Sequence, residues 1–147
     1  MNESLEEFRA RTGARIGPET GAFHQLVGYR IVIRDDGTPT VELDLSADKH
    51  LNQYGGAHGG VALTLLDTVG GVAVYATGDP FDRIATISLS SNFLDAPTPG
   101  LVTARATIDR IGGSVAYTTM WLHQGDLDGP VMATGQGAYR LFRSRKG

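Results

Sequence analysis

The chain has 147 residues, of which 41% are hydrophobic and 20% are charged. We expect a single globular domain over residues 1–147, with a sizeable buried core. The formal net charge of −3 gives no general attraction to a phosphate backbone, so we expect no nucleic-acid partner. The absence of cysteine excludes disulfides, thiolate metal sites and cysteine nucleophiles.

The N-terminal extension, residues 1–20, begins with a charged segment. This segment lacks the apolar run that a signal peptide or a membrane span requires, so we expect a cytoplasmic protein with no membrane partner. Leu5 and Phe8 lie one helical turn apart before Gly13, which predicts a short amphipathic helix. We therefore expect the extension to be partly helical.

The next segment has the pattern of a β-hairpin. Residues 31–33 are β-branched and predict a strand, and Asp36 and Gly37 predict a turn. In residues 41–45 apolar side chains alternate with polar ones. This alternation is typical of a strand with one solvent-exposed face.

A polar, glycine-rich loop over residues 47–60 leads into an apolar run over residues 61–76. The run is too long for a typical strand, and its only strongly polar side chains are Thr64, Asp67 and Thr68. This composition is too apolar for a surface helix. We therefore predict a buried central helix.

The rest of the sequence contains four β-rich stretches separated by glycine- and proline-containing turns. These stretches are Ile84–Leu94, Leu101–Ile111, Ser114–His123 and Val131–Phe142. We predict an antiparallel meander and an α+β fold class. A nearly apolar helix needs cover around most of its circumference, and an antiparallel sheet wrapped round one central helix supplies that cover. This is the hotdog arrangement.

Paired glycines stand at the start of the predicted helix. Gly59 and Gly60 leave the N–H groups of the helix N-terminus uncovered by any Cβ, and with the helix dipole such groups can stabilise a developing oxyanion. Gly59 is the leading donor. The commoner role of paired glycines is to make a tight turn before a helix, and the pair alone does not decide between the two roles.

Asp67 lies within the apolar helix, where an unpaired carboxylate costs several kcal/mol. A structural hydrogen bond or a solvent-facing window would explain it as well as catalysis would. Its helical neighbours are mostly small, and they include Gly70 and Gly71. Two glycines in a helix interior cost about 0.8–1.0 kcal/mol each relative to alanine, which calls for an explanation such as close approach of a strand or access to a site. With the small neighbours, it supports a cleft beside Asp67.

Asn52 and His58 precede the helix and are candidate catalytic residues. Their side chains can position a carbonyl or a water, although capping of the loop and of the helix start is the commoner role. The sequence contains neither a His-Glu-x-x-His motif nor another clustered metal-binding spacing, so we expect no metal. Serine-hydrolase, Walker and dinucleotide-binding motifs are also absent from the sequence.

Six residues around the helix start form a recognisable pattern. They are Asn52, Gly55, His58, Gly59, Gly60 and Asp67. With the helix between them, they resemble the signature of the PaaI-like and THEM-type acyl-CoA thioesterases of the hotdog-fold superfamily. The resemblance extends from Leu26 to Gly135 and leaves out the N-terminal residues.

This resemblance implies an enzyme that hydrolyses acyl-coenzyme A to a free acid and coenzyme A, without a cofactor. It implies that Asp67 is the nucleophile or general base. It places the oxyanion hole on the backbone of the His58-Gly59 pair, and it gives Asn52 the task of orienting the thioester or the water. The acyl group stays open among aryl, short and medium chains.

A serine or threonine on the strand after the helix commonly assists the water in these enzymes. When Phe93 and Leu94 are placed against the family's aromatic position, Thr86 takes that role. Ser88 is the alternative.

The turn after the second strand of the meander resembles the family's loop near the coenzyme A phosphates. A basic residue often follows the glycine there, whereas this sequence has a second glycine. The candidate phosphate contacts are Arg110, Gly112, Gly113, Ser114 and Arg140. Guanidinium groups suit phosphate oxygens, although an arginine at a strand end is more often a solvated charge.

Two other functions fit the same fold. A hydratase or dehydratase of acyl thioesters would bring a different acid/base pair to the substrate, and the spacing from Asn52 to Asp67 favours hydrolysis instead. A non-catalytic acyl-CoA sensor would retain the pocket without a working acid. The position of Asp67 on a glycine-lined face argues against this sensor.

Helix length predicts the assembly. Asp67 follows Gly59 by eight residues, which at 1.5 Å per residue separates them by about 12 Å. One thioester carbonyl cannot span this distance, so we expect a homodimer as the minimal active unit, with each site shared between antiparallel helices. The resemblance implies that such dimers pair into a homotetramer.

Overall fold

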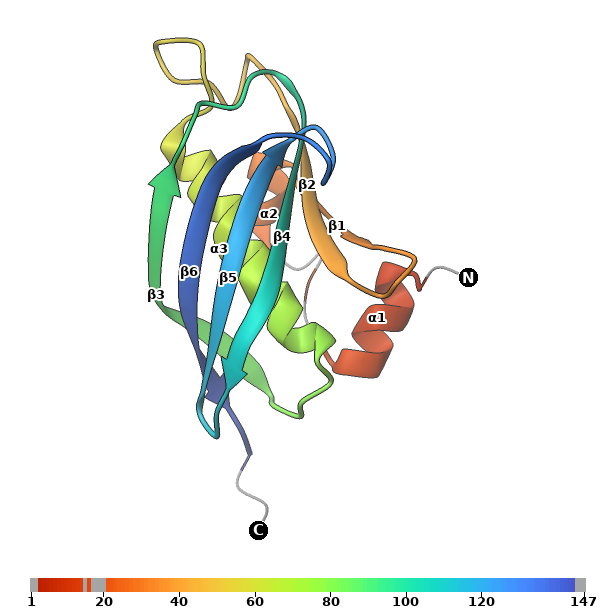
Figure 1. Cartoon of the computed structure of the whole chain (residues 1–147). Helices are drawn as coiled ribbons and strands as arrows, with labels where there is room; N and C mark the ends of the chain where they lie inside the picture. Colours follow the sequence, from red (N-terminus) through yellow and green to blue (C-terminus); the bar gives the residue numbers. More distant parts are fainter. Residues whose placement is uncertain (1–2, 15, 17–20, 145–147) are drawn as a thin grey trace.

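The computed structural model describes residues 3–14, 16 and 21–144. A six-stranded antiparallel sheet curves around a single long helix, α3, as Figure 1 shows. The elements in chain order are α1 (Leu5–Thr12), α2 (Ala22–Val27), β1 (Arg30–Ile33), β2 (Pro39–Leu45), α3 (Gly59–Ala76), β3 (Arg83–Phe93), β4 (Gly100–Ile111), β5 (Val115–Gln124) and β6 (Val131–Phe142). The predicted α+β hotdog fold is confirmed.

The sheet order corrects the predicted meander. The strands lie in the order β1-β2-β4-β5-β6-β3, so only β4, β5 and β6 form a meander. β3 pairs with β6 at the far edge, because β2 already occupies the free side of β4. The connection from β3 to β4 contains Pro97 and Pro99 and crosses the end of the sheet instead of making a tight hairpin (Figure 1).

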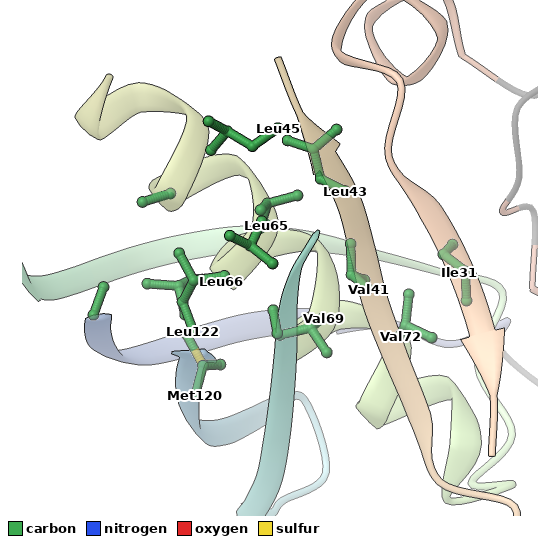
Figure 2. Close-up of a cluster of buried hydrophobic side chains, with 14 of the residues drawn as sticks. Ile31, Val41, Leu43, Leu45, Leu65, Leu66, Val69, Val72, Met120 and Leu122 are labelled. Atoms are coloured by element: carbon green, nitrogen blue, oxygen red, sulfur yellow. The ribbon is translucent and has the colours of Figure 1, made fainter. Parts of the chain in front are cut away.

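The main core lies between α3 and the concave face of the sheet. Leu65, Leu66 and Val69 on α3 are fully buried, and Val41 and Leu43 of β2 face them (Figure 2). By length and composition, α3 is the one described helix that could cross a membrane. In this fold its apolar side chains are covered by the sheet instead.

Helix α1 lies within the N-terminal extension, where the sequence predicts a helix. Ser4 caps its start, and the Glu7 side chain bonds back to the Ser4 backbone to complete a capping box. Gly13 ends the helix in the left-handed conformation, with φ of 71°. Phe8 is fully buried and joins α1 to the main core.

The short helix α2 is an element that the sequence analysis does not predict. It has six residues and lies between Gly21 and Gly28, the latter a left-handed cap with φ of 84°. His24 holds it in place by a 2.6 Å hydrogen bond to the carbonyl of Tyr29 and by stacking on the Tyr29 ring. A helix of fewer than two turns gives too little periodicity to be recognised from sequence.

The two edges of the sheet differ in length and charge. β1 has four residues, and its Arg30 pairs with Glu42 and Asp44 on β2. β3 has eleven residues, and Arg83 at its start is its only charged side chain. The side chain of Ile87 is 56% exposed near the middle of β3. The β3 edge is therefore long and largely uncharged.

Candidate active site

The loop before α3 is closed on itself and presents Asn52 beside the helix start. An antiparallel bridge joins Leu51 to Ala57 across its base. The Oδ1 atom of Asn52 accepts hydrogen bonds from the N–H of Tyr54 at 2.8 Å and of Gly56 at 3.3 Å. These bonds fix the amide orientation, and the Asn52 NH2 group makes no hydrogen bond to a described residue.

His58 is the N-cap of α3, and its side chain makes the capping contact that the sequence analysis gives as its commoner role. Its Nδ1 atom accepts a 2.9 Å hydrogen bond from the Gly60 N–H. The Gly59 N–H makes no hydrogen bond to any residue in the described part of the chain. Of the two paired glycines, Gly59 is therefore the one with a donor available to a ligand.

Asn52 and Gly59 line the same cavity, which we call the donor pocket. Its volume is about 320 Å³. It is lined by Asn52, Ala57, Gly59, Ala62, Phe93, Asp95, Ala96, Pro97 and Ala133. The sequence analysis missed Asp95, whose only signal is that it closely follows the end of a predicted strand. The Asp95 carboxylate accepts the N–H of Ala96 at 2.8 Å.

Asp67 is half-buried and is held by a hydroxyl from the edge strand. The Oγ1 atom of Thr86 donates a 2.7 Å hydrogen bond to Asp67 Oδ1. A register shift between Thr86 and Ser88 follows directly along β3. Ser88 lies in a different hollow, with Asp109 and Tyr117, so of the two candidates Thr86 is the one that contacts Asp67. Its role in assisting the water stays a prediction.

Asp67 and Thr86 line a second cavity, which we call the carboxylate pocket. Its volume is also about 320 Å³. It is lined by Ile16, Asp67, Thr68, Gly71, Val72, Tyr75, Ile84, Ala85, Thr86 and Tyr139. Burial raises the pKa of the Tyr139 hydroxyl, and the Asp67 carboxylate lies close enough to raise it further.

The two helix glycines beside Asp67 match the two explanations that the sequence leaves open, close approach of a strand for Gly70 and access to a site for Gly71. A Cβ on Gly70 would overlap the hydroxyl of Tyr139 and lie 3.0 Å from Thr118 Oγ1, so this space is filled by protein. Gly71 lines the carboxylate pocket as expected. The hydroxyl of Tyr139 donates a 2.9 Å hydrogen bond to the Asp67 carbonyl, and burial together with the Asp67 charge raises the Tyr139 pKa.

No described residue lines both pockets. The donor pocket lies at the start of α3, and the carboxylate pocket lies along its middle. Within one chain, Asn52 and Gly59 therefore lie at the start of α3, Asp67 and Thr86 lie beside its middle, and the two pairs do not share a cavity.

The candidate phosphate contacts gather around the β4–β5 turn, at the end of the sheet opposite the start of α3 (Figure 1). Arg140 pairs in register with Val115, and the Gly113 carbonyl accepts a 2.9 Å hydrogen bond from Arg143. None of these candidates lines either pocket, and their role in phosphate binding stays a prediction. The described residues contain no group of three or more His, Asp or Glu side chains placed to hold a metal ion.

Comparison with known proteins finds relatives that are named as an esterase and as a CoA hydrolase. A protein of Halobacterium salinarum named as an esterase is 36% identical over 95 residues, which cover 60% of this chain. The match spans 62% of the archaeal protein's own length, just under two thirds. The 1,4-dihydroxy-2-naphthoyl-CoA hydrolase of Listeria monocytogenes is 28% identical over 97 residues, covering 66% of this chain and 76% of that enzyme.

Solved structures share the fold over nearly the whole chain. A Bacillus halodurans protein crystallised with CoA has a TM-score of 0.77 at 23% identity, and covers 96% of this chain and 89% of that one. A thioesterase of Ralstonia eutropha related to phenylacetic acid degradation has a TM-score of 0.71 at 26% identity, covering 90% and 96% of the two chains. The family model described as the thioesterase superfamily matches residues 54–130, which include Gly59, Asp67 and Thr86. Since this match covers more than half of the sequence, the chain belongs to the thioesterase superfamily.

Proposed function

We propose that this protein hydrolyses the thioester bond of an acyl-coenzyme A. The observation that carries the proposal is the carboxylate of Asp67, which receives a hydrogen bond from Thr86 and lines an open pocket. Two comparisons support a CoA thioester as the substrate. The Listeria relative is named as an acyl-CoA hydrolase, and the Bacillus halodurans structure contains CoA.

The donor pocket holds the groups that polarise the thioester carbonyl. The Gly59 N–H lies at the positive end of α3, where it stabilises negative charge on the thioester oxygen as the carbonyl is attacked. Asn52 lines the same pocket, and its NH2 group can orient the thioester or the water. Neither role requires a cofactor.

The carboxylate pocket supplies the nucleophilic half. As a general base, Asp67 accepts a proton from a water whose oxygen attacks the carbonyl carbon, and the tetrahedral intermediate then expels the CoA thiolate. The proton on Asp67 passes to the departing sulfur. As a nucleophile, Asp67 would instead attack the carbonyl carbon and displace the CoA thiolate, which forms a mixed anhydride. Water then hydrolyses the anhydride to the free acid and restores Asp67, and both routes use the position that Thr86 fixes.

The two halves line separate pockets within one chain, so the proposal includes a homodimer in which they meet across the interface. Long, uncharged edge strands are usually covered by another strand or element, and β3 is such an edge. Pairing of two β3 strands about a twofold axis would also bring two α3 helices side by side and antiparallel. The donor pocket of one chain would then face the carboxylate pocket of its partner. We propose that such dimers pair into tetramers.

An assay panel tests the activity. Benzoyl-CoA, butyryl-CoA and octanoyl-CoA represent aryl, short and medium acyl groups, and release of free thiol is measured with a thiol-reactive dye. Crotonyl-CoA is tested in parallel for hydration of its double bond. We expect thiol release from at least one member of the panel and no hydration. Hydration without thiol release would identify a hydratase, and binding without either reaction would identify a sensor.

A further inference from the structure

Tyr139 makes a contact to the candidate catalytic residue that core packing alone does not require. The side chain is 1% exposed, and its hydroxyl donates a 2.9 Å hydrogen bond to the backbone carbonyl of Asp67. This carbonyl lies in the middle of α3, where a carbonyl oxygen already accepts a bond within the helix. The tyrosine bond is thus an addition to the ordinary helical pattern.

Two glycines make room for this side chain. A Cβ on Gly70 would overlap the Tyr139 hydroxyl. A Cβ on Gly137, two residues before Tyr139 on β6, would lie 2.8 Å from the ring. Glycine destabilises helix and strand interiors, so this opening is maintained against the local preference of both elements.

Tyr139 and Thr86 are direct partners in the β3–β6 register. Thr86 donates to the Asp67 carboxylate, while Tyr139 donates to the Asp67 carbonyl. Two neighbouring hydroxyls on adjacent strands therefore hold the side chain and the backbone carbonyl of the same aspartate. Both also line the carboxylate pocket.

We infer that Tyr139 is a positioning residue, which fixes the backbone of Asp67 so that the Thr86 hydrogen bond sets a single orientation of its carboxylate. This inference rests on the proposed hydrolase function. Catalytic groups must be held within a fraction of an ångström of their working geometry, and a fixed backbone together with a fixed carboxylate oxygen leaves the aspartate side chain little freedom. Burial raises the Tyr139 pKa, which keeps the hydroxyl protonated and able to donate.

The test is a double-mutant cycle of Tyr139→Phe with Asp67→Asn, assayed on the best substrate among benzoyl-CoA, butyryl-CoA and octanoyl-CoA. The phenylalanine keeps the ring and removes only the hydroxyl. We expect Tyr139→Phe alone to lower kcat about tenfold with KM within about twofold of the wild-type value. In the Asp67→Asn background we expect it to change the residual kcat by less than about twofold, because its effect acts through Asp67.

A purely structural role would lower turnover by the same factor in both backgrounds, and that result would overturn the inference. Unchanged kcat in Tyr139→Phe would overturn it as well. Tyr29→Phe is the matched control, because it removes a phenolic hydroxyl from a residue that packs against the main core outside both pockets. It should leave kcat unchanged.

A crystal structure of Tyr139→Phe decides the question if Asp67→Asn has no measurable turnover. We expect the distance from Thr86 Oγ1 to Asp67 Oδ1 to exceed the 2.7 Å of the wild-type chain. An unchanged distance would reject the inference. Full activity of a folded Asp67→Asn variant would remove Asp67 from the mechanism and reject the inference. Absence of thiol release from the wild-type chain on the whole substrate panel would instead reject the proposed function, so the two failures are distinguishable.

Discussion

The two halves of the candidate site are built in different ways. The donor pocket takes its two candidate catalytic residues, Asn52 and Gly59, from one short stretch, in which the loop closes on itself and leads directly into α3. The carboxylate pocket joins Asp67 to Thr86 and Tyr139, which lie on three different elements. The first half depends on local backbone geometry, whereas the second depends on how α3 packs against the sheet.

This difference predicts how each half responds to substitution. The donor half uses the main-chain N–H of Gly59, so a small side chain that keeps this N–H should be tolerated there. The carboxylate half uses side-chain atoms, so each loss of a polar atom should reduce turnover. The following variants test this contrast.

Asp67→Asn should have the largest effect. The amide is nearly isosteric with the carboxylate but is neither basic nor nucleophilic, so we expect thiol release to fall by about 10³-fold with the fold intact. Circular dichroism and thermal melting provide the control for folding. Turnover near the wild-type rate in a folded variant would remove Asp67 from the mechanism.

Gly59→Pro should follow, with a loss of about 10²-fold or more. Gly59 is the first residue of α3, where proline fits the helix and removes only an N–H that the helix does not use. His58 before it has φ of −61° and ψ of 136°, a conformation that a following proline favours. The fold should therefore survive, and thiol release measures the loss.

Gly59→Ala is the matched control for this variant. The alanine keeps the N–H, and its Cβ would meet the Phe93 ring at 3.5 Å, an ordinary contact. We expect it to retain most of the wild-type turnover. If the proline variant is as active as the alanine variant, the oxyanion donor is a different group.

The same contrast explains how much could be predicted from the sequence. The loop, the start of α3 and the position of Asp67 follow from consecutive residues and helical periodicity, and the structure places them as expected. All strands except β2 are also predicted within one residue of their ends, because turn-forming residues lie beside them. β2 begins at Pro39, two residues before the predicted start. The sequence could not show that β3 pairs with β6, since this pairing depends on contacts between distant segments.

Long-range packing also decided the partners of Asp67. Strand periodicity places Thr86 and Ser88 on the same face, and only the register shift between them separates their environments. The prediction that Thr86, and not Ser88, assists the water therefore rests on family resemblance and not on the strand pattern. Tyr139 is 72 residues from Asp67 and had no local signal at all. The only feature of the sequence that could have indicated its position is the Gly70-Gly71 pair, which is otherwise unfavourable in a helix.

Thr86→Ala should lower turnover less than Asp67→Asn or Gly59→Pro does. It leaves the Asp67 carboxylate in place but removes the 2.7 Å hydrogen bond to it, and we expect kcat to fall about tenfold. Thr86→Ser keeps a hydroxyl and should recover most of this loss. Ser88→Ala should leave kcat unchanged, because Ser88 lies outside both pockets. Equal losses in the Thr86 and Ser88 alanine variants would contradict the assignment.

The smallest expected change, a factor of about two, comes from a dimer of two different chains, one carrying Asp67→Ala and the other Asn52→Ala. Each variant should be nearly inactive as a homodimer, because every site then contains one defect. In the mixed dimer, a site that takes its carboxylate from one chain and its donor pocket from the other is either doubly defective or intact. One intact site should therefore return about half of the wild-type turnover per dimer.

The mixed dimer is isolated by co-expressing the two chains with different affinity tags and purifying on both. The recovery has a definite geometric cause, because Gly59 and Asp67 are eight residues apart on one helix and line separate pockets. A site complete within one chain would contain one defect in each half of the mixed dimer, and the preparation would be as inactive as its parents. Recovery thus requires that the two differently built halves meet across a subunit interface, and its absence would place them in one chain despite their separation of about 12 Å along α3.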